Sequence, residues 1–127
     1  MAVIRHKLKL NNSKIQQIER AQKIALYETM DALKTDVIQS QVMPFDVGTM
    51  QNESTFIATS KNGKVASLIT RTPYARRLYY HPEYNFQKTN NPNAQGQWLE
   101  DYISGSKKEF CQEQFAKFFE GKVEWLN

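Results

Sequence analysis

Three arginines and three tyrosines occur within residues 71–80, and these side-chain types bind anions and flat rings. An arginine guanidinium matches phosphate oxygens bidentately, and tyrosine rings stack on the bases of single-stranded nucleic acid. Both residue types are also enriched at the hot spots of protein–protein interfaces. The segment therefore predicts a binding surface for nucleic acid or for protein. The candidate contact residues, including three further along the chain, are Arg71, Tyr74, Arg76, Arg77, Tyr79, Tyr80, Tyr84, Phe86 and Trp98.

Residues with catalytic or metal-binding chemistry are sparse in this sequence. His81 and Glu83 could imitate an acid–base pair, and Asp46 with Glu53 could imitate part of a metal site, but neither pair has a third partner in the sequence. The chain has no zinc-ligand spacing, glycine-rich phosphate loop or nucleophile elbow. Cys111 falls on an apolar helical stripe, where cysteine usually acts as a small buried hydrophobe. The sequence predicts no enzyme activity, no cofactor and no metal site.

Length and composition are those of one small domain. The chain has 127 residues, of which 40% are hydrophobic and 24% are charged, and these values are ordinary for a soluble globular protein. Its single cysteine excludes an intrachain disulfide. No stretch has the apolar core of a signal peptide or the length of a transmembrane helix. These features predict a protein that is made and kept in the cytoplasm, without membrane association.

The net charge of +4 is unevenly distributed. Residues 41–97 carry six Lys and Arg against three Asp and Glu, whereas residues 98–127 carry four against six. A basic body with an acidic C-terminal segment permits contact with nucleic acid, and it equally permits head-to-tail packing between identical subunits. A charge of this size is also common for solubility alone.

The first element that must position these residues is a long helix, predicted over residues 12–41. Ser13 and Gln16 match a capping box at its start. An apolar stripe then recurs at three- to five-residue steps, and its members are Ile15, Ile18, Ala21, Ala25, Met30, Leu33 and Val37. Such a helix is roughly 40 Å long. The stripe could pack on the chain's own sheet, against another subunit, or against both.

Residues 42–71 predict a loop followed by a β-hairpin. The segment 43–48 contains proline and glycine, which is typical of a loop. Two β-rich runs follow, over residues 54–59 and 64–70. Between them, Asn62-Gly63 is the pair that a two-residue type I′ turn prefers. This is the strongest local structural signal in the chain.

Residues 72–97 combine the tyrosines and arginines with turn residues. The block that ends at Trp98 holds four of the six tyrosines and three of the four prolines. Thr72 and Pro73 predict the N-cap and first residue of a short helix that ends before Pro82. The remainder, with Tyr84 and Phe86, predicts an ordered loop of about 16 residues, a length that is usually functional. Tyr74, Leu78 and Trp98 are expected to lie in the core.

Residues 98–127 predict a C-terminal helix, or a pair of helices, and a short tail. Ser104-Gly-Ser106 is expected to bend or split the helix, and Gly121 is expected to cap its end. Trp125 in the tail could fold back on the domain or dock on a partner. With residues 1–11 as a basic lead, the whole chain is expected to form a single domain.

Two stretches carry a resemblance to a known family. The sequence TPYARRLYYHPEYNF over residues 72–86, followed by NPNAQGQW over residues 91–98, closely resembles minor capsid proteins of tailed bacteriophages and prophages of Gram-positive bacteria. The loop with Pro44, Asp46 and Gly48 is similar to the wider group of head–tail joining and tail-completion proteins. The positions that match the family's motifs are Pro44, Asp46, Gly48, Pro73, Tyr74, Ala75, Arg76, Leu78, Tyr79, Tyr80, Pro92, Asn93, Ala94 and Trp98.

The resemblance implies a small α+β domain, in which a long N-terminal helix packs on a small twisted antiparallel sheet, with a short helix, a long loop and a C-terminal helix. It also implies a structural virion protein of the phage neck, assembled in the host cytoplasm, that forms a homo-oligomeric ring around the DNA channel. Its partners would be copies of itself, other neck and tail proteins and, weakly, the passing DNA. The family implies no catalytic residues or cofactors. Ser104-Gly-Ser106 is the one departure from this pattern, because the family is expected to have an uninterrupted final helix.

A nucleic-acid-binding module that uses the Arg/Tyr block is the alternative prediction. In either case the nine candidate residues would contact a partner rather than carry out a reaction. A small hydrolase that uses His81 and Glu83 is the third and weakest possibility.

Overall fold

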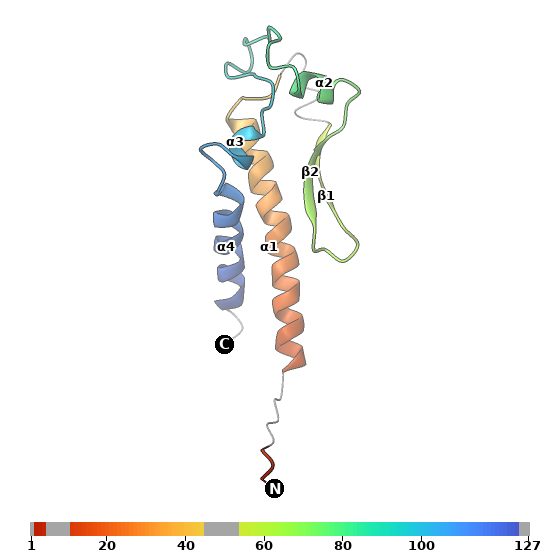
Figure 1. Ribbon diagram of the computed structural model, residues 1–127, viewed down its shortest axis with the longest axis vertical. Coiled ribbons are helices and arrows are strands. Elements are labelled where there is room, and N and C mark those ends of the chain that lie inside the picture. Colours follow the sequence, from red (N-terminus) through yellow and green to blue (C-terminus); the bar gives the residue numbers. More distant parts are fainter. Residues whose placement is uncertain (1, 5–10, 45–53, 125–127) are drawn as a thin grey trace.

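A single long helix organises the chain. The computed structural model describes residues 2–4, 11–44 and 54–124. Figure 1 shows helix α1 (Asn12–Gln39) at the centre, with helix α4 (Phe110–Val123) along one side and the hairpin of strands β1 (Thr55–Thr59) and β2 (Ala66–Thr70) along the other. The predicted α+β class, with a long N-terminal helix packed on a small antiparallel sheet, is confirmed. None of the helices in the described residues is long and apolar enough to cross a membrane.

Helix α1 begins at a different cap from the one predicted. The N-cap is Asn11, whose side chain accepts a hydrogen bond of 3.1 Å from the backbone N–H of Lys14. The predicted capping box at Ser13 is therefore wrong, because asparagine is at least as good a cap as serine and lies earlier in the chain. At the other end the chain leaves the helix through Gln41, whose φ of 55° is left-handed.

The apolar stripe of α1 is buried only from its middle onward. The buried residues are spaced four apart, and they are Ala21, Ala25, Thr29, Leu33 and Val37. Ile15 and Ile18, at the start of the predicted stripe, are each more than a third exposed. Thr29 is tolerated in this row because its hydroxyl donates to the carbonyl of Ala25 at 2.7 Å. The first turns of α1 thus extend beyond the elements that flank the rest of the helix.

The predicted hairpin is present, but its turn differs. Thr55 pairs with Thr70 and Thr59 with Ala66, the register expected for a turn centred on Asn62 and Gly63. A type I′ turn needs positive φ at both central residues, and only Gly63 has it, at 71°. The Asn62 side chain explains this, because its Oδ1 accepts from the Lys64 N–H at 2.9 Å and from the Ser60 hydroxyl at 2.7 Å. The side chain thus replaces strand hydrogen bonds at the tip.

The remaining helices are short, and two predicted caps are wrong. Helix α2 (Ala75–Tyr79) has Tyr74 as its N-cap, and Thr72 instead accepts from the Ala75 N–H through its backbone carbonyl. Helix α3 (Glu100–Ile103) and α4 are separate, as the predicted split at Ser104-Gly-Ser106 required. Gly121 does not end α4, which continues to Val123.

The core lies where the end of α1 meets α2 and the segment before α3. Its buried members are Leu33, Val37, Met43, Ala75 and Trp98. Leu68 of the hairpin, Tyr102 of α3 and Phe110 of α4 pack against it. Helix α4 and strand β2 themselves contribute no fully buried side chain. The predicted loop residues Asp46 and Gly48, the Glu53 carboxylate and the tail residue Trp125 lie outside the described residues.

Candidate interaction surface

The structure separates the nine predicted contact residues into three groups. Trp98 is buried, and Tyr79, Tyr84 and Phe86 are partly buried. The fully exposed group, which is free to meet a partner, consists of Arg71, Tyr74, Arg76, Arg77 and Tyr80.

The exposed arginines are supported by aromatic rings. The guanidinium carbon of Arg76 lies 6.0 Å from the centroid of the Tyr80 ring, and that of Arg77 lies 5.8 Å from the centroid of Tyr84. Arg77 Nε also donates to the Tyr84 hydroxyl at 3.2 Å. Such stacking restrains a long side chain without neutralising its charge. Arg76 and Arg77 line a shallow depression together with Pro73, Tyr80 and His81.

Arg71 belongs to a different part of the surface. It directly follows β2, and its guanidinium lies 5.3 Å from the centroid of Phe56 on β1. Phe56 pairs with Ile69 across the hairpin. Thr55, on the opposite face of the sheet, is buried. Arg71 is therefore placed on the outer face of the hairpin, apart from Arg76 and Arg77.

Two aromatic residues of the block were assigned to the wrong environment. Tyr74 is 45% exposed, so the prediction that it lies in the core is wrong. Tyr79 instead packs against the core, with its ring 4.9 Å from that of Trp98 in an edge-on arrangement. Burial, followed by the charge of Glu100, raises the pKa of Tyr79. Tyr74 precedes α2 as its N-cap residue, and the side of α2 that packs on the core is formed by Ala75, Leu78 and Tyr79, which lie at helical spacing.

The long loop between α2 and α3 is fastened to the end of α1. Asn91 donates through its side chain to the carbonyl of Met43 at 2.9 Å, and Asn93 donates to that of Ser40 at 3.0 Å. The backbone N–H of Gln95 adds a bond of 2.9 Å to Val42. These bonds satisfy the backbone carbonyls of the C-cap residue Ser40 and of Val42 and Met43 in the segment that follows α1. The second half of the loop therefore has a structural role within its own chain.

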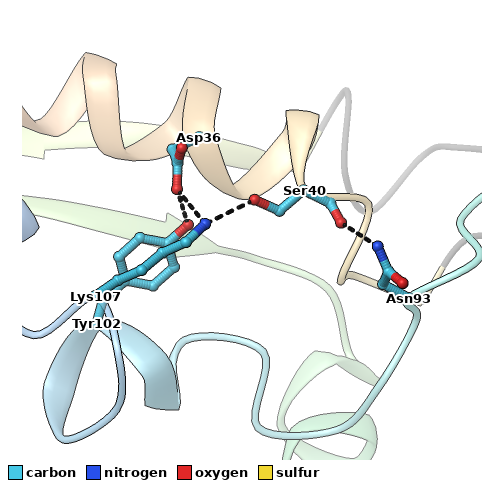
Figure 2. A network of polar contacts seen from close by, with 5 residues as sticks. All are labelled: Asp36, Ser40, Asn93, Tyr102 and Lys107. Atoms are coloured by element: carbon cyan, nitrogen blue, oxygen red, sulfur yellow. Dashed lines mark hydrogen bonds and ion pairs between the residues drawn. The ribbon is translucent and has the colours of Figure 1, made fainter.

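A polar network joins the same end of α1 to the C-terminal helices. Figure 2 shows Tyr102 and Lys107 converging on Asp36, with bonds of 2.5 Å and 2.8 Å to its Oδ2 atom. Lys107 also donates to the Ser40 hydroxyl at 3.0 Å. Burial, followed by Asp36, raises the pKa of Tyr102 well above its usual range. Sequence reasoning missed this network, because nothing in the spacing of these residues indicates that they meet.

A glycine in the loop gives a direct test of this packing. A Cβ at Gly96 would lie 2.7 Å from Cα and 2.9 Å from N of Pro82, both backbone atoms that cannot rotate away. We expect Gly96→Ala to lower the free energy of unfolding by about 2 kcal/mol, measured by urea denaturation. The matched control is Gly121→Ala, because a Cβ at this position meets nothing within 4 Å. We expect this substitution to stabilise helix α4 by about 0.5–1 kcal/mol. Equal effects of the two substitutions would contradict this account of the loop.

The structure describes two groups with catalytic potential, the His81–Glu83 pair and the thiol of Cys111. His81 Nδ1 lies 2.7 Å from Glu83 Oε1 at an exposed position, and the His81 ring stacks on Tyr84 at 4.7 Å. The hydrogen bond from His81 lowers the pKa of Glu83, so this carboxylate is ionised at neutral pH and is no proton donor. Burial raises the pKa of the Cys111 thiol, which weakens it as a nucleophile. Within the described residues, no group of three or more His, Cys, Asp or Glu could hold a metal.

Comparisons with known proteins returned no match to a family model, to a curated protein or to a solved structure.

Proposed function

We propose that this chain is a structural protein of the neck of a tailed phage virion, where a ring of copies joins the DNA-filled capsid to the tail. The sequence resemblance of residues 72–98 supports this proposal. The structural observation that carries it is that both flanks of α1 retain partly exposed apolar side chains.

The first flank is helix α4. None of its side chains is fully buried, although it contains Phe115, Phe118 and Phe119. Phe115 and Phe119 stack on each other at 5.8 Å and remain only partly covered by α1. The second flank is the hairpin, whose outer face presents Phe56 and Ile69. Partly exposed apolar side chains on two flanks favour association with a partner.

Two different apolar flanks on opposite sides of one helix favour a particular kind of assembly. A subunit that uses one self-complementary patch forms a closed dimer, whereas two unlike patches make head-to-tail contacts that close into a ring. A ring acts by geometry, and it needs neither a reaction centre nor a strong grip on DNA. Its partners would be copies of the chain, the adjoining neck and tail proteins and, weakly, the passing genome. Its location would be the virion, after assembly in the host cytoplasm.

Nucleic-acid binding is the second candidate, and Arg76 and Arg77 favour it. Both side chains are exposed, and within the described residues neither has a carboxylate within ion-pair distance. Two arginines are a small basic patch compared with the phosphate contacts that a dedicated DNA-binding protein makes. The ring proposal therefore explains more of the surface.

One experiment with purified protein separates the two candidates. We expect light scattering after size exclusion to give a multiple of the chain mass that persists between about 0.15 M and about 1 M salt, because apolar contacts carry most of the association. DNA binding by gel shift should be weak and should disappear as salt rises. A protein that stays monomeric at high concentration and shifts DNA at physiological salt would refute the ring proposal.

A further inference from the structure

The two arginines of helix α2 have no carboxylate within ion-pair distance among the residues that the structure describes. Their side chains are restrained by Tyr80 and Tyr84, and the nearby Glu83 is already paired with His81. We call Arg76 and Arg77 the basic patch. It lines a shallow depression on the surface, which suits the insertion of a carboxylate from a partner, since a guanidinium binds carboxylate bidentately.

The side of the molecule that carries α3 and α4 has the complementary charge. Helix α3 and the first turn of α4 present four exposed carboxylates, which we call the acidic flank: Glu100, Asp101, Glu109 and Glu113. Of the nearest lysines, Lys107 is bound to Asp36 of α1, and the exposed Lys108 offsets at most one of the four negative charges. A second depression lies on this flank, and Lys107 and Lys108 line it together with Glu109 and Glu113.

The two patches are placed where a head-to-tail contact needs them. Figure 1 shows α2 and α3 near the same end of the molecule, with α2 on the side of the hairpin and α3 on the side of α4. A copy displaced sideways would therefore bring its acidic flank toward the basic patch of its neighbour. Repeating the same displacement with a constant rotation closes a ring.

We propose that the basic patch of one copy docks on the acidic flank of the next copy. This inference rests on the proposed ring and specifies which surfaces meet in it. Charge complementarity of this kind sets orientation and register more than affinity. The partly exposed aromatic side chains of α4 and of the hairpin supply the apolar area. The result is an interface with a defined polarity, in which like patches repel.

Charge reversal tests the pairing. Variant A carries Arg76→Glu and Arg77→Glu, so both of its patches are acidic, and variant B carries Glu100→Lys, Asp101→Lys, Glu109→Lys and Glu113→Lys, so both of its patches are basic. We expect each alone to assemble at least about tenfold more weakly than the unaltered chain. An equimolar mixture of A and B should recover assembly, because acidic and basic patches then alternate. Light scattering and native mass spectrometry would report the mass and the composition of the complexes.

Matched controls make the test specific. The first control combines Lys61→Glu with Lys64→Glu and reverses two exposed charges at the tip of the hairpin. The second control, Glu120→Lys, reverses one exposed charge near the C-terminal end of α4. These controls should assemble as the unaltered chain does, and circular dichroism should show that every variant is folded.

Each outcome has a distinct meaning. If the unaltered chain assembles and variants A and B assemble equally well, the proposed pairing is wrong while the ring stands. If both variants are impaired but their mixture does not recover assembly, the pairing is also wrong. If variant A loses only DNA binding and variant B gains it, the basic patch binds phosphate rather than a second copy. If the unaltered chain is monomeric throughout, both the ring and the pairing fail.

Discussion

Replacing Trp98 by alanine should lower the free energy of unfolding by about 3–5 kcal/mol, the largest effect expected for any single substitution in this chain. Its side chain is 3% exposed and lies in the core with Leu33, Val37 and Met43. It also carries the edge-on contact with Tyr79 that holds α2 in place. Few other side chains in the described residues are fully buried. The cavity left by removal of the indole therefore has few neighbouring side chains that could move in to fill it.

Urea denaturation followed by circular dichroism would measure this loss. The matched control is Tyr80→Ala, which removes a large aromatic side chain from the same block at a position that is 63% exposed. We expect that control to change stability by less than about 0.5 kcal/mol. If Trp98→Ala cost no more than the control, Trp98 would be a contact residue for a partner, and the core described above would be wrong.

Replacing Asp36 by alanine should have the second-largest effect, a loss of about 2–3 kcal/mol at neutral pH, because hydrogen bonds to a charged group are the strong ones. Asp36 is the common acceptor for Tyr102 and Lys107, and these two bonds tie the C-terminal segment to α1. A double-mutant cycle of Asp36→Ala with Lys107→Met isolates the ion pair. A coupling energy near zero would show that the pair contributes nothing beyond its separate members.

The Asp36 interaction should also depend on pH in a defined direction. Burial alone would raise the pKa of this carboxyl, but hydrogen bonds from Lys107 and Tyr102 and the charge of Lys107 outweigh it and lower the pKa below 3.8. A group with a lowered folded pKa stabilises the fold above its unfolded pKa, and that contribution is lost as pH falls through the folded value. The stability difference between the unaltered chain and Asp36→Ala should therefore shrink from about pH 5 to about pH 2. A difference that is constant over this range would exclude an ionised Asp36 as its source.

The elements with a strong local pattern could be predicted from the sequence. The long helix follows from its apolar stripe, the register of the hairpin from Asn62-Gly63, and the split before α4 from Ser104-Gly-Ser106. Their ends could not be predicted as well, because several residues compete for each cap. The N-cap of α1 is Asn11 rather than the predicted Ser13, and the N-cap of α2 is Tyr74 rather than the predicted Thr72. Tyr74 precedes α2 as its N-cap residue, and Tyr79 within α2 packs against the core.

The candidate surface was predictable in composition but not in geometry. Arginines and tyrosines in one block indicated a binding surface, and the exposed Arg76 and Arg77 are compatible with that interpretation. The sequence did not indicate that Asn91 and Asn93 fasten the loop to the end of α1, since both contacts join residues about fifty positions apart. Contacts of this kind depend on the path of the whole chain, and the local spacing of residue types does not indicate them.

The anchored loop also has a consequence for how the sequence can change in length. Its first part is held by the stacked rings of His81 and Tyr84, and its last part by amide bonds that begin at Asn91. Between these anchors, residues 87–90 are exposed. An exposed stretch between two fixed points can absorb inserted residues at a small entropic cost. Homologous chains that differ in length are therefore expected to differ here first, and a peptide tag placed here should leave the fold intact.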